Sequence, residues 1–201
     1  FLSVPSNIDY LLNSNCLSSN DHISLLNLSE NCPEIMFVDH YDCHLYASFF
    51  SSSFSECAYA IVDGRGEIKT QELGKLKSDL SKEILVTQNF PNSLGLFYGT
   101  VTQLLGYKPD GDEWKVMAMG AYANRSDAIA DNAFSYAIDI DESGRIVTDM
   151  NLFAYSNYWE PKMYTNTLLK DLNVEKDNKG KLLISEERKY EIALSLQKRF
   201  E

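Results

Sequence analysis

The chain has 201 residues, of which 44% are hydrophobic and 12% aromatic, which is enough apolar content to bury the core of one domain. Its 29 acidic residues outnumber its 18 basic residues and give a formal net charge of -11. This balance, without any Lys/Arg-rich block, argues against nucleic-acid binding but allows a local pocket for a small anion. No charged leader with an apolar core opens the sequence, and no apolar run approaches the roughly 18 residues of a membrane span. We therefore predict a soluble, cytoplasmic protein without membrane contact.

The cysteines form neither a C-x-x-C pair nor a zinc-ribbon spacing. Two disulfides remain possible, but free thiols are favoured in a chain with this apolar fraction. The four residues concerned are Cys16, Cys32, Cys43 and Cys57.

The first elements are predicted from apolar spacing. Residues 8–16 have helical periodicity, and residues 35–38 form a short apolar run typical of a buried strand. A helix is expected over residues 40–50. Residues 57–62 predict a second buried strand that ends at Asp63-Gly64.

A tight turn at Gly64 and Gly66 predicts that residues 67–72 run back as a hairpin partner, followed by a strand over residues 84–87. Ser93 is the expected N-cap of a helix over residues 94–105, closed by Gly106.

The last third of the chain is predicted to mix helices with a hairpin. Helices are expected over residues 113–119 and 127–136, and the Glu142-Ser143-Gly144 turn predicts a hairpin between residues 137–140 and 146–148. A polar linker at residues 175–181 precedes a helix that Ser185 would cap. Strands with intervening helices indicate an α/β layer structure with some antiparallel pairing.

Both termini fall inside predicted helices. The sequence starts without Met and stops at Glu201 with no Gly or Pro to end the last helix. We therefore expect residues 1–201 to be a single partial domain, truncated at both ends.

Two weak motifs point to chemistry. His40 and His44 are four residues apart, so on a helix both imidazoles would face one cation, although such a pair is also common on ordinary helix surfaces. Asp63-Gly64-x-Gly66 places a carboxylate and two glycines at a strand end, where a cation or phosphate can approach, although it is equally a simple turn.

These motifs belong to a longer ordered pattern. It comprises D-H-Y-D-C-H at residues 39–44, V-D-G-x-G-E at residues 62–67, F-P-x-S-L-G-L-F-Y at residues 90–98, E-W-K-V-M at residues 113–117 and E-I-A-L-S-L-Q at residues 191–197. In this order the blocks resemble the carbamoyltransferase family of nodulation and antibiotic-tailoring enzymes.

The resemblance implies an ASKHA-type (Kae1-like) α/β fold with a mixed sheet and flanking helices. It also implies a two-part O-carbamoyltransferase, whose second, YrdC-like domain is absent here. That domain would make carbamoyl-adenylate from carbamoyl phosphate and ATP, and the ASKHA-type domain would transfer the carbamoyl group to a hydroxyl of a small-molecule acceptor.

The resemblance also assigns roles to residues. His40, His44 and Asp63 would be the catalytic residues and would bind a divalent metal, with iron favoured. Asp63, Gly64, Gly66 and Lys115 would contact the nucleotide or carbamoyl group, although Lys115 could equally be a solvated helix residue.

Departures from the family pattern leave alternatives open. Tyr41 replaces a family histidine, and residues 118–123 read A-M-G-A-Y-A where the family has G-L-A-P-Y-G, so the Ala methyl groups could crowd a ligand. A sugar-kinase-like phosphotransferase and a non-catalytic module with a decayed site are the alternative readings. With the lobes of the full-length chain missing, we expect weak metal binding and no turnover.

Overall fold

The structure is a computed structural model that describes residues 38–123, 134–156 and 161–201. The chain divides into two compact units, Phe1–Ser52 and Ser53–Glu201, and each is considered by itself. The predicted helix over residues 8–16, most of the strand over residues 35–38 and most of the helix over residues 127–136 lie outside the described residues, as do Cys16 and Cys32. Cys43 and Cys57 carry free thiols, as predicted.

The described part of the first unit is helix α3 (His40–Phe50), which confirms the predicted helix. The Asp39 carboxylate caps it by accepting hydrogen bonds from the backbone N–H groups of Tyr41 at 2.9 Å and Asp42 at 3.1 Å. Tyr41, Leu45 and Phe49 are buried at four-residue spacing, so one stripe of the helix is apolar and covered.

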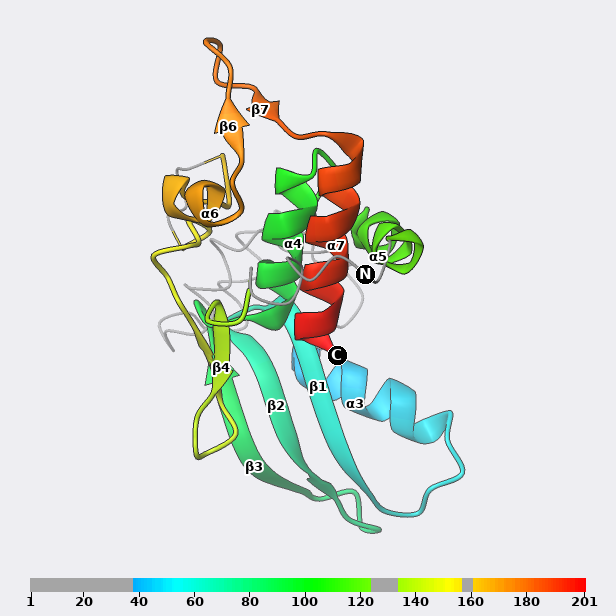
Figure 1. Cartoon of the computed structure of the whole chain (residues 1–201). Coiled ribbons are helices and arrows are strands. Elements are labelled where there is room, and N and C mark those ends of the chain that lie inside the picture. The colour runs from blue at the N-terminus through cyan, green and yellow to red at the C-terminus, as the bar shows by residue number, and fades with distance from the viewer. Residues whose placement is uncertain (1–37, 124–133, 157–160) are drawn as a thin grey trace, which may run out of the picture. The chain divides into compact units, whose positions relative to one another are not determined.

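The second unit begins with a three-stranded antiparallel sheet in the order β1-β2-β3 (Figure 1). Its strands are β1 (Cys57–Gly66), β2 (Lys69–Leu76) and β3 (Lys82–Asn89). All pairs among the described strands are antiparallel, so the mixed sheet that we expected is not found in this part of the chain.

Strand β1 differs from its prediction in two ways. It does not end at Asp63-Gly64 but continues to Gly66 through an irregularity between Val62 and Gly66, because a bulge lets pairing resume after the chain bends. It is also not buried on both faces: Val62 is 47% exposed whereas Ile61 is 9% exposed, the alternation of a half-covered antiparallel strand.

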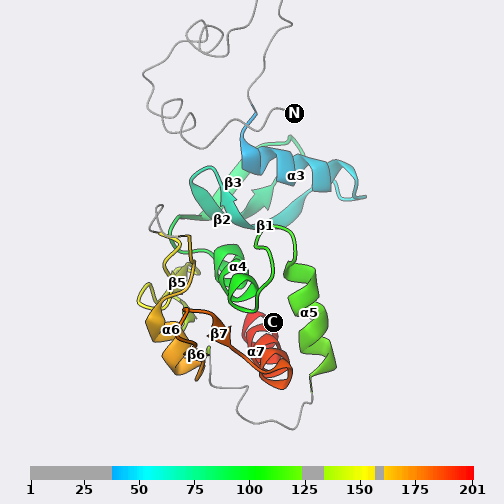
Figure 2. The same cartoon turned by 90° about the horizontal axis from the view of Figure 1, so that it is seen from above.

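Three helices form the bulk of the second unit: α4 (Leu94–Leu104), α5 (Glu113–Tyr122) and α7 (Glu186–Phe200). In Figure 2, which looks along α4 and α7, α5 runs beside α7. Gly120 permits this contact, since a Cβ there would lie only 3.1 Å from the backbone oxygen of Ala193. The predicted N-caps Ser93 and Ser185 and the left-handed Gly106 beyond α4 are confirmed.

Smaller elements complete the unit. The predicted hairpin forms as β4 (Ile138–Ile140) and β5 (Ile146–Thr148), and the short helix α6 (Asn166–Asp171) was not predicted. The predicted polar linker is wrong, because β6 (Glu175–Lys176) pairs with β7 (Leu182–Leu183) in a second hairpin.

Three aromatic rings connect these elements in the core. Phe97 of α4 makes edge contacts with Phe134 and Phe153, each with ring centroids 5.5 Å apart. All three side chains are at most 2% exposed. None of the described helices combines the length and apolar character that crossing a membrane requires.

Candidate metal and ligand site

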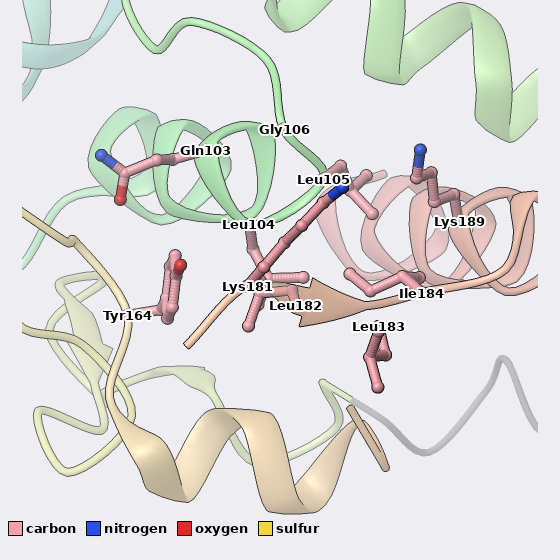
Figure 3. A pocket seen from close by; sticks show the side chains of 10 residues that line it. All are labelled: Gln103, Leu104, Leu105, Gly106, Tyr164, Lys181, Leu182, Leu183, Ile184 and Lys189. Atoms are coloured by element: carbon pink, nitrogen blue, oxygen red, sulfur yellow. The ribbon is translucent and has the colours of Figure 1, made fainter. Parts of the chain in front are cut away.

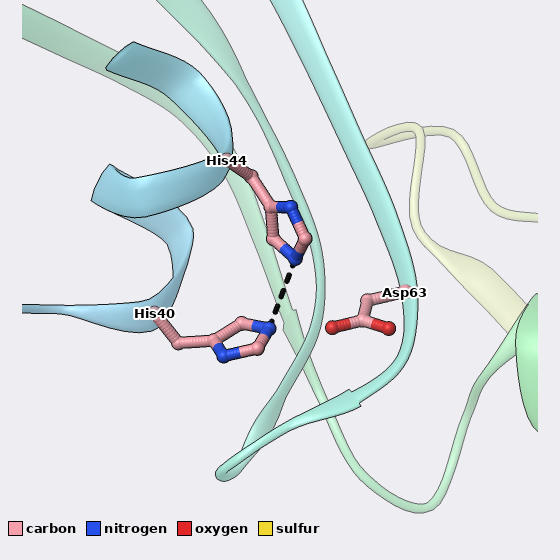
Figure 4. Close-up of side chains that lie close together, drawn as sticks. All are labelled: His40, His44 and Asp63. Carbon is pink, nitrogen blue, oxygen red and sulfur yellow. Dashed lines mark hydrogen bonds between the residues drawn. The ribbon is translucent and has the colours of Figure 1, made fainter. Parts of the chain in front are cut away.

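Helix α3 brings the two predicted histidine ligands together (Figure 4). The Nε2 atoms of His40 and His44 lie 3.0 Å apart, and their ring centroids are 4.6 Å apart. Two nitrogens about 2.1 Å from one cation would be about 3.0 Å apart at a 90° angle and about 3.4 Å apart at the tetrahedral angle. The pair therefore fits two adjacent ligands of one metal ion, and it also fits a hydrogen bond between neutral rings.

Asp63 lies in the bulged part of β1. Its Oδ1 accepts a hydrogen bond of 2.6 Å from the N–H of Gly64. Ser93 holds the same two residues: its hydroxyl donates to the carbonyl oxygen of Gly64 at 2.7 Å and is 3.2 Å from that of Asp63. Ser93 is completely buried and also caps α4 by accepting from the N–H of Leu96 at 3.1 Å.

The first turn of α4 rests directly on this bulge. A Cβ at Gly95 would lie 2.5 Å from the Cα and 2.6 Å from the nitrogen of Gly64, whereas a Cβ at Gly64 would meet nothing within 4 Å. Gly95 is thus required by packing, whereas the sequence motif points to Gly64 and Gly66.

Two side-chain amides, one at the end of β3 and one in the loop before α4, form hydrogen bonds to β5. Gln88 accepts a hydrogen bond from the N–H of Ile146 at 2.6 Å and donates to the carbonyl oxygen of the same residue. The Oδ1 of Asn92 accepts from the N–H of Thr148 at 2.9 Å. Strand β5 therefore receives these hydrogen bonds in addition to its pairing with β4, and the sequence gives no signal for them.

A cavity of about 1080 Å³ lies beside the bulge, within the second unit. Asp63, Gly64 and Gly95 are part of its wall, and Gly66 and Lys115 are not. Large apolar or aromatic side chains supply much of the remaining wall: Phe90, Leu96, Tyr98, Trp114, Met117, Tyr155, Met163 and Phe200.

Lys115 is engaged outside this cavity. Its Nζ forms an ion pair of 2.8 Å with Asp112 and lies over the rings of Tyr107 and Trp114, at 5.8 and 5.5 Å from the centroids. Met117, two residues further along α5, is 54% exposed and lines the cavity.

Two phenol groups in the cavity wall stay protonated well above neutral pH. Burial, with a smaller contribution from the Glu113 carboxylate, raises the pKa of Tyr98 to about 12, and its hydroxyl donates to Gln197 at 3.1 Å. Burial likewise raises the pKa of Tyr155 to about 12.

The structure shows where the residues that depart from the family pattern lie. Tyr41 is only 1% exposed, so its ring is part of the covered stripe of α3. Ala118 and Ala123 do not line the cavity, and without a proline at position 121 helix α5 continues to Tyr122.

A second cavity of about 510 Å³ lies where the end of α4 meets β7 and the start of α7 (Figure 3). Aliphatic side chains make up half of its lining residues, and Lys181 and Lys189 also line it. None of the residues predicted to carry chemistry reaches it.

Comparison with known proteins identifies the class. The family described as Carbamoyltransferase N-terminus matches residues 12–199, nearly the whole chain. The chain therefore belongs to the carbamoyltransferase family, as the ordered motifs predicted.

Individual relatives are longer proteins. An uncharacterised protein of Synechocystis sp. (sll1178) is 31% identical over 147 residues, which is 72% of this chain and 22% of that protein. An uncharacterised protein of Methanocaldococcus jannaschii (MJ1051) is 29% identical over 125 residues, 61% of this chain and 24% of that protein. The nodulation protein NolNO of Sinorhizobium fredii is 33% identical over 92 residues, 45% of this chain and 13% of that protein. The chain thus spans less than a quarter of each of these relatives.

Proposed function

We propose that this chain supplies the metal-binding part of an O-carbamoyltransferase with an ASKHA-type fold. The whole enzyme would transfer a carbamoyl group from carbamoyl-adenylate, made from carbamoyl phosphate and ATP, to a hydroxyl of a small molecule. The observation that carries the proposal is the His40/His44 pair, whose two Nε2 atoms are 3.0 Å apart in a chain that belongs to the carbamoyltransferase family.

In this proposal His40, His44 and Asp63 hold a divalent metal ion, iron by family resemblance. The donor set is suitable, because neutral imidazole nitrogens and a carboxylate oxygen are ligands that iron and zinc both accept. When bound, such an ion would polarise the carbamoyl carbonyl and neutralise phosphate charge.

The proposed transfer forms one bond and breaks one. The acceptor oxygen forms a bond to the carbamoyl carbon, the bond from that carbon to the phosphate oxygen breaks, and AMP leaves with the electron pair. The hydroxyl proton passes to solvent. On this chain, Ser93 and Gly95 hold the bulge that carries Asp63, and the apolar side chains of the cavity wall limit the access of water to the Asp63 carboxylate.

Metal titration of this chain tests the proposal. Isothermal titration with iron(II) under anaerobic conditions, and with zinc(II), should give one site per chain. His44→Ala and Asp63→Asn should each weaken binding about tenfold or more through the loss of a ligand. His22→Ala, which changes the third histidine, is the matched control and should leave binding unchanged. Equal effects of His22→Ala and His44→Ala would remove the α3 pair from the proposal.

Turnover distinguishes the reaction type. A chain of the relatives' full length, incubated with carbamoyl phosphate, ATP and a hydroxyl acceptor, should release AMP and form a carbamoylated product. Release of ADP would instead indicate a phosphotransferase, and no release of either nucleotide would indicate a non-catalytic module.

A further inference from the structure

We propose that Arg65, and not Lys115, contacts the phosphate group of a nucleotide ligand in the cavity beside the β1 bulge. This inference rests on the proposed function only for the identity of the ligand. The position of Arg65 is a property of the second unit alone.

Arg65 is the single cationic side chain in the cavity wall formed by described residues. No carboxylate in the described part of the chain forms an ion pair with it, unlike Lys115, which Asp112 neutralises at 2.8 Å. A guanidinium in a cavity without a carboxylate partner keeps its donors available for an anion.

The ring of Phe90 supports this guanidinium. The Arg65 Cζ lies 5.6 Å from the centroid of the Phe90 ring, within the range of a cation–π interaction. This contact restricts the side chain, so less conformational freedom is lost when the planar fork binds two oxygens of a phosphate group.

The rest of the wall suggests what else the anion would carry. Trp114 and Tyr155 offer aromatic surface to a planar ring, and their cavity is large enough for a molecule of nucleotide size. Three carboxylates also line the cavity. Asp63, at the bulge, accepts a hydrogen bond from the N–H of Gly64. Asp110 and Glu113 lie near the start of α5, where Glu113 accepts hydrogen bonds from the N–H groups of Asp110 and Gly111. Since these negative charges repel an anion, the phosphate should bind at Arg65 and the uncharged part of the ligand should extend toward α5.

Paired titrations with AMP and adenosine test the phosphate contact on the 201-residue chain. Wild-type protein should bind AMP more tightly than adenosine. Arg65→Gln should weaken AMP binding about tenfold and leave adenosine binding unchanged, because only the charge-assisted hydrogen bonds are lost. Lys115→Gln removes the same charge outside the cavity and should change neither affinity. Thermal unfolding followed by circular dichroism confirms that both variants fold.

Three results would overturn the inference: no change in AMP affinity in Arg65→Gln, equal affinities of the wild type for AMP and adenosine, or no binding of either ligand. A loss of AMP affinity in Lys115→Gln alone would assign the contact to Lys115 and would overturn it too. None of these results bears on the histidine pair, because the metal titration and the release of AMP during turnover test the proposed function separately.

Discussion

At the scale of single residues, two glycines of α4 differ sharply in what surrounds them. Gly95 faces backbone: an added Cβ would lie 2.5 Å from the Cα of Gly64. Unlike a side chain, this backbone cannot relieve the clash by changing rotamer. Gly99, one turn later, would place a Cβ 3.7 Å from Met163 and Pro109, which is ordinary contact. The same substitution should therefore have opposite effects at the two positions.

We expect Gly95→Ala to lower the free energy of unfolding by about 2 kcal/mol or more, because α4 must move away from the β1 bulge. Gly99→Ala should raise it by about 0.5–1 kcal/mol, since alanine is a better helix residue and its methyl group fits. Urea unfolding monitored by circular dichroism measures both. Similar values for the two variants would contradict the close approach of Gly95 to Gly64.

At the scale of elements, two serines begin helices but have different neighbours. Ser93 and Ser185 each accept a hydrogen bond from the backbone three residues on, at 3.1 Å in both cases. Only Ser93 also donates to the β1 bulge, at 2.7 Å to the Gly64 carbonyl oxygen, and it is completely buried. Comparison of the two alanine variants therefore separates two contributions to the free energy of unfolding: that of the N-cap hydrogen bond and that of the hydrogen bond to the strand.

Ser185→Ala should lower the free energy of unfolding by about 1 kcal/mol, the usual effect of a lost N-cap. Ser93→Ala should lower it by about 2–3 kcal/mol, because it also leaves a carbonyl oxygen of the bulge without its buried donor. Chemical denaturation of both variants provides the measurement. Equal losses would mean that the link to Gly64 adds no stability.

The elements also show which structural features a sequence encodes locally. Helices α4 and α7 are predictable because their serine caps and apolar spacing lie within one short segment of the chain, and α3 is predicted by its sequence without a predicted cap. The β6–β7 hairpin was missed because its strands have two residues each and its turn is closed by Asp177, whose carboxylate accepts from the N–H groups of Lys179 and Lys181. Such polar turns have the same composition as a linker.

The candidate site also combines features that the local sequence encodes with features that depend on the fold. The four-residue spacing of His40 and His44 is local, so the pairing of their rings on α3 was predictable. The position of Arg65 over Phe90 depends on where β1 and the loop before α4 meet, which are 25 positions apart in the chain. Only the folded arrangement reveals that the cation in the cavity wall comes from β1 and not from α5.

At the scale of the whole molecule, three buried or hydrogen-bonded tyrosines make stability depend on alkaline pH. Burial raises the pKa of Tyr98 and Tyr155 to about 12, with an added effect of Glu113 on Tyr98. Partial desolvation and the hydrogen bond to Asp171 raise the pKa of Tyr136 to about 12, although its side chain is 50% exposed. The ordinary value of 10.0 applies once the chain unfolds. Because the folded-state pKa is the higher one, the folded protein retains protons that the unfolded chain releases above pH 10.

The stabilising contribution of these phenol groups should therefore be fully present below pH 10 and should be lost as the pH rises from about 10 to 12. The net charge of -11 acts in the same direction, since each phenolate adds to the existing repulsion. Urea unfolding at a series of pH values should show this decline, and Tyr155→Phe should make it less steep. Tyr122→Phe is the matched control, because the Tyr122 side chain is 83% exposed and its removal should leave the slope unchanged. An unchanged slope in Tyr155→Phe would mean that this phenol group titrates alike in the folded and unfolded states, contrary to its burial in the cavity wall.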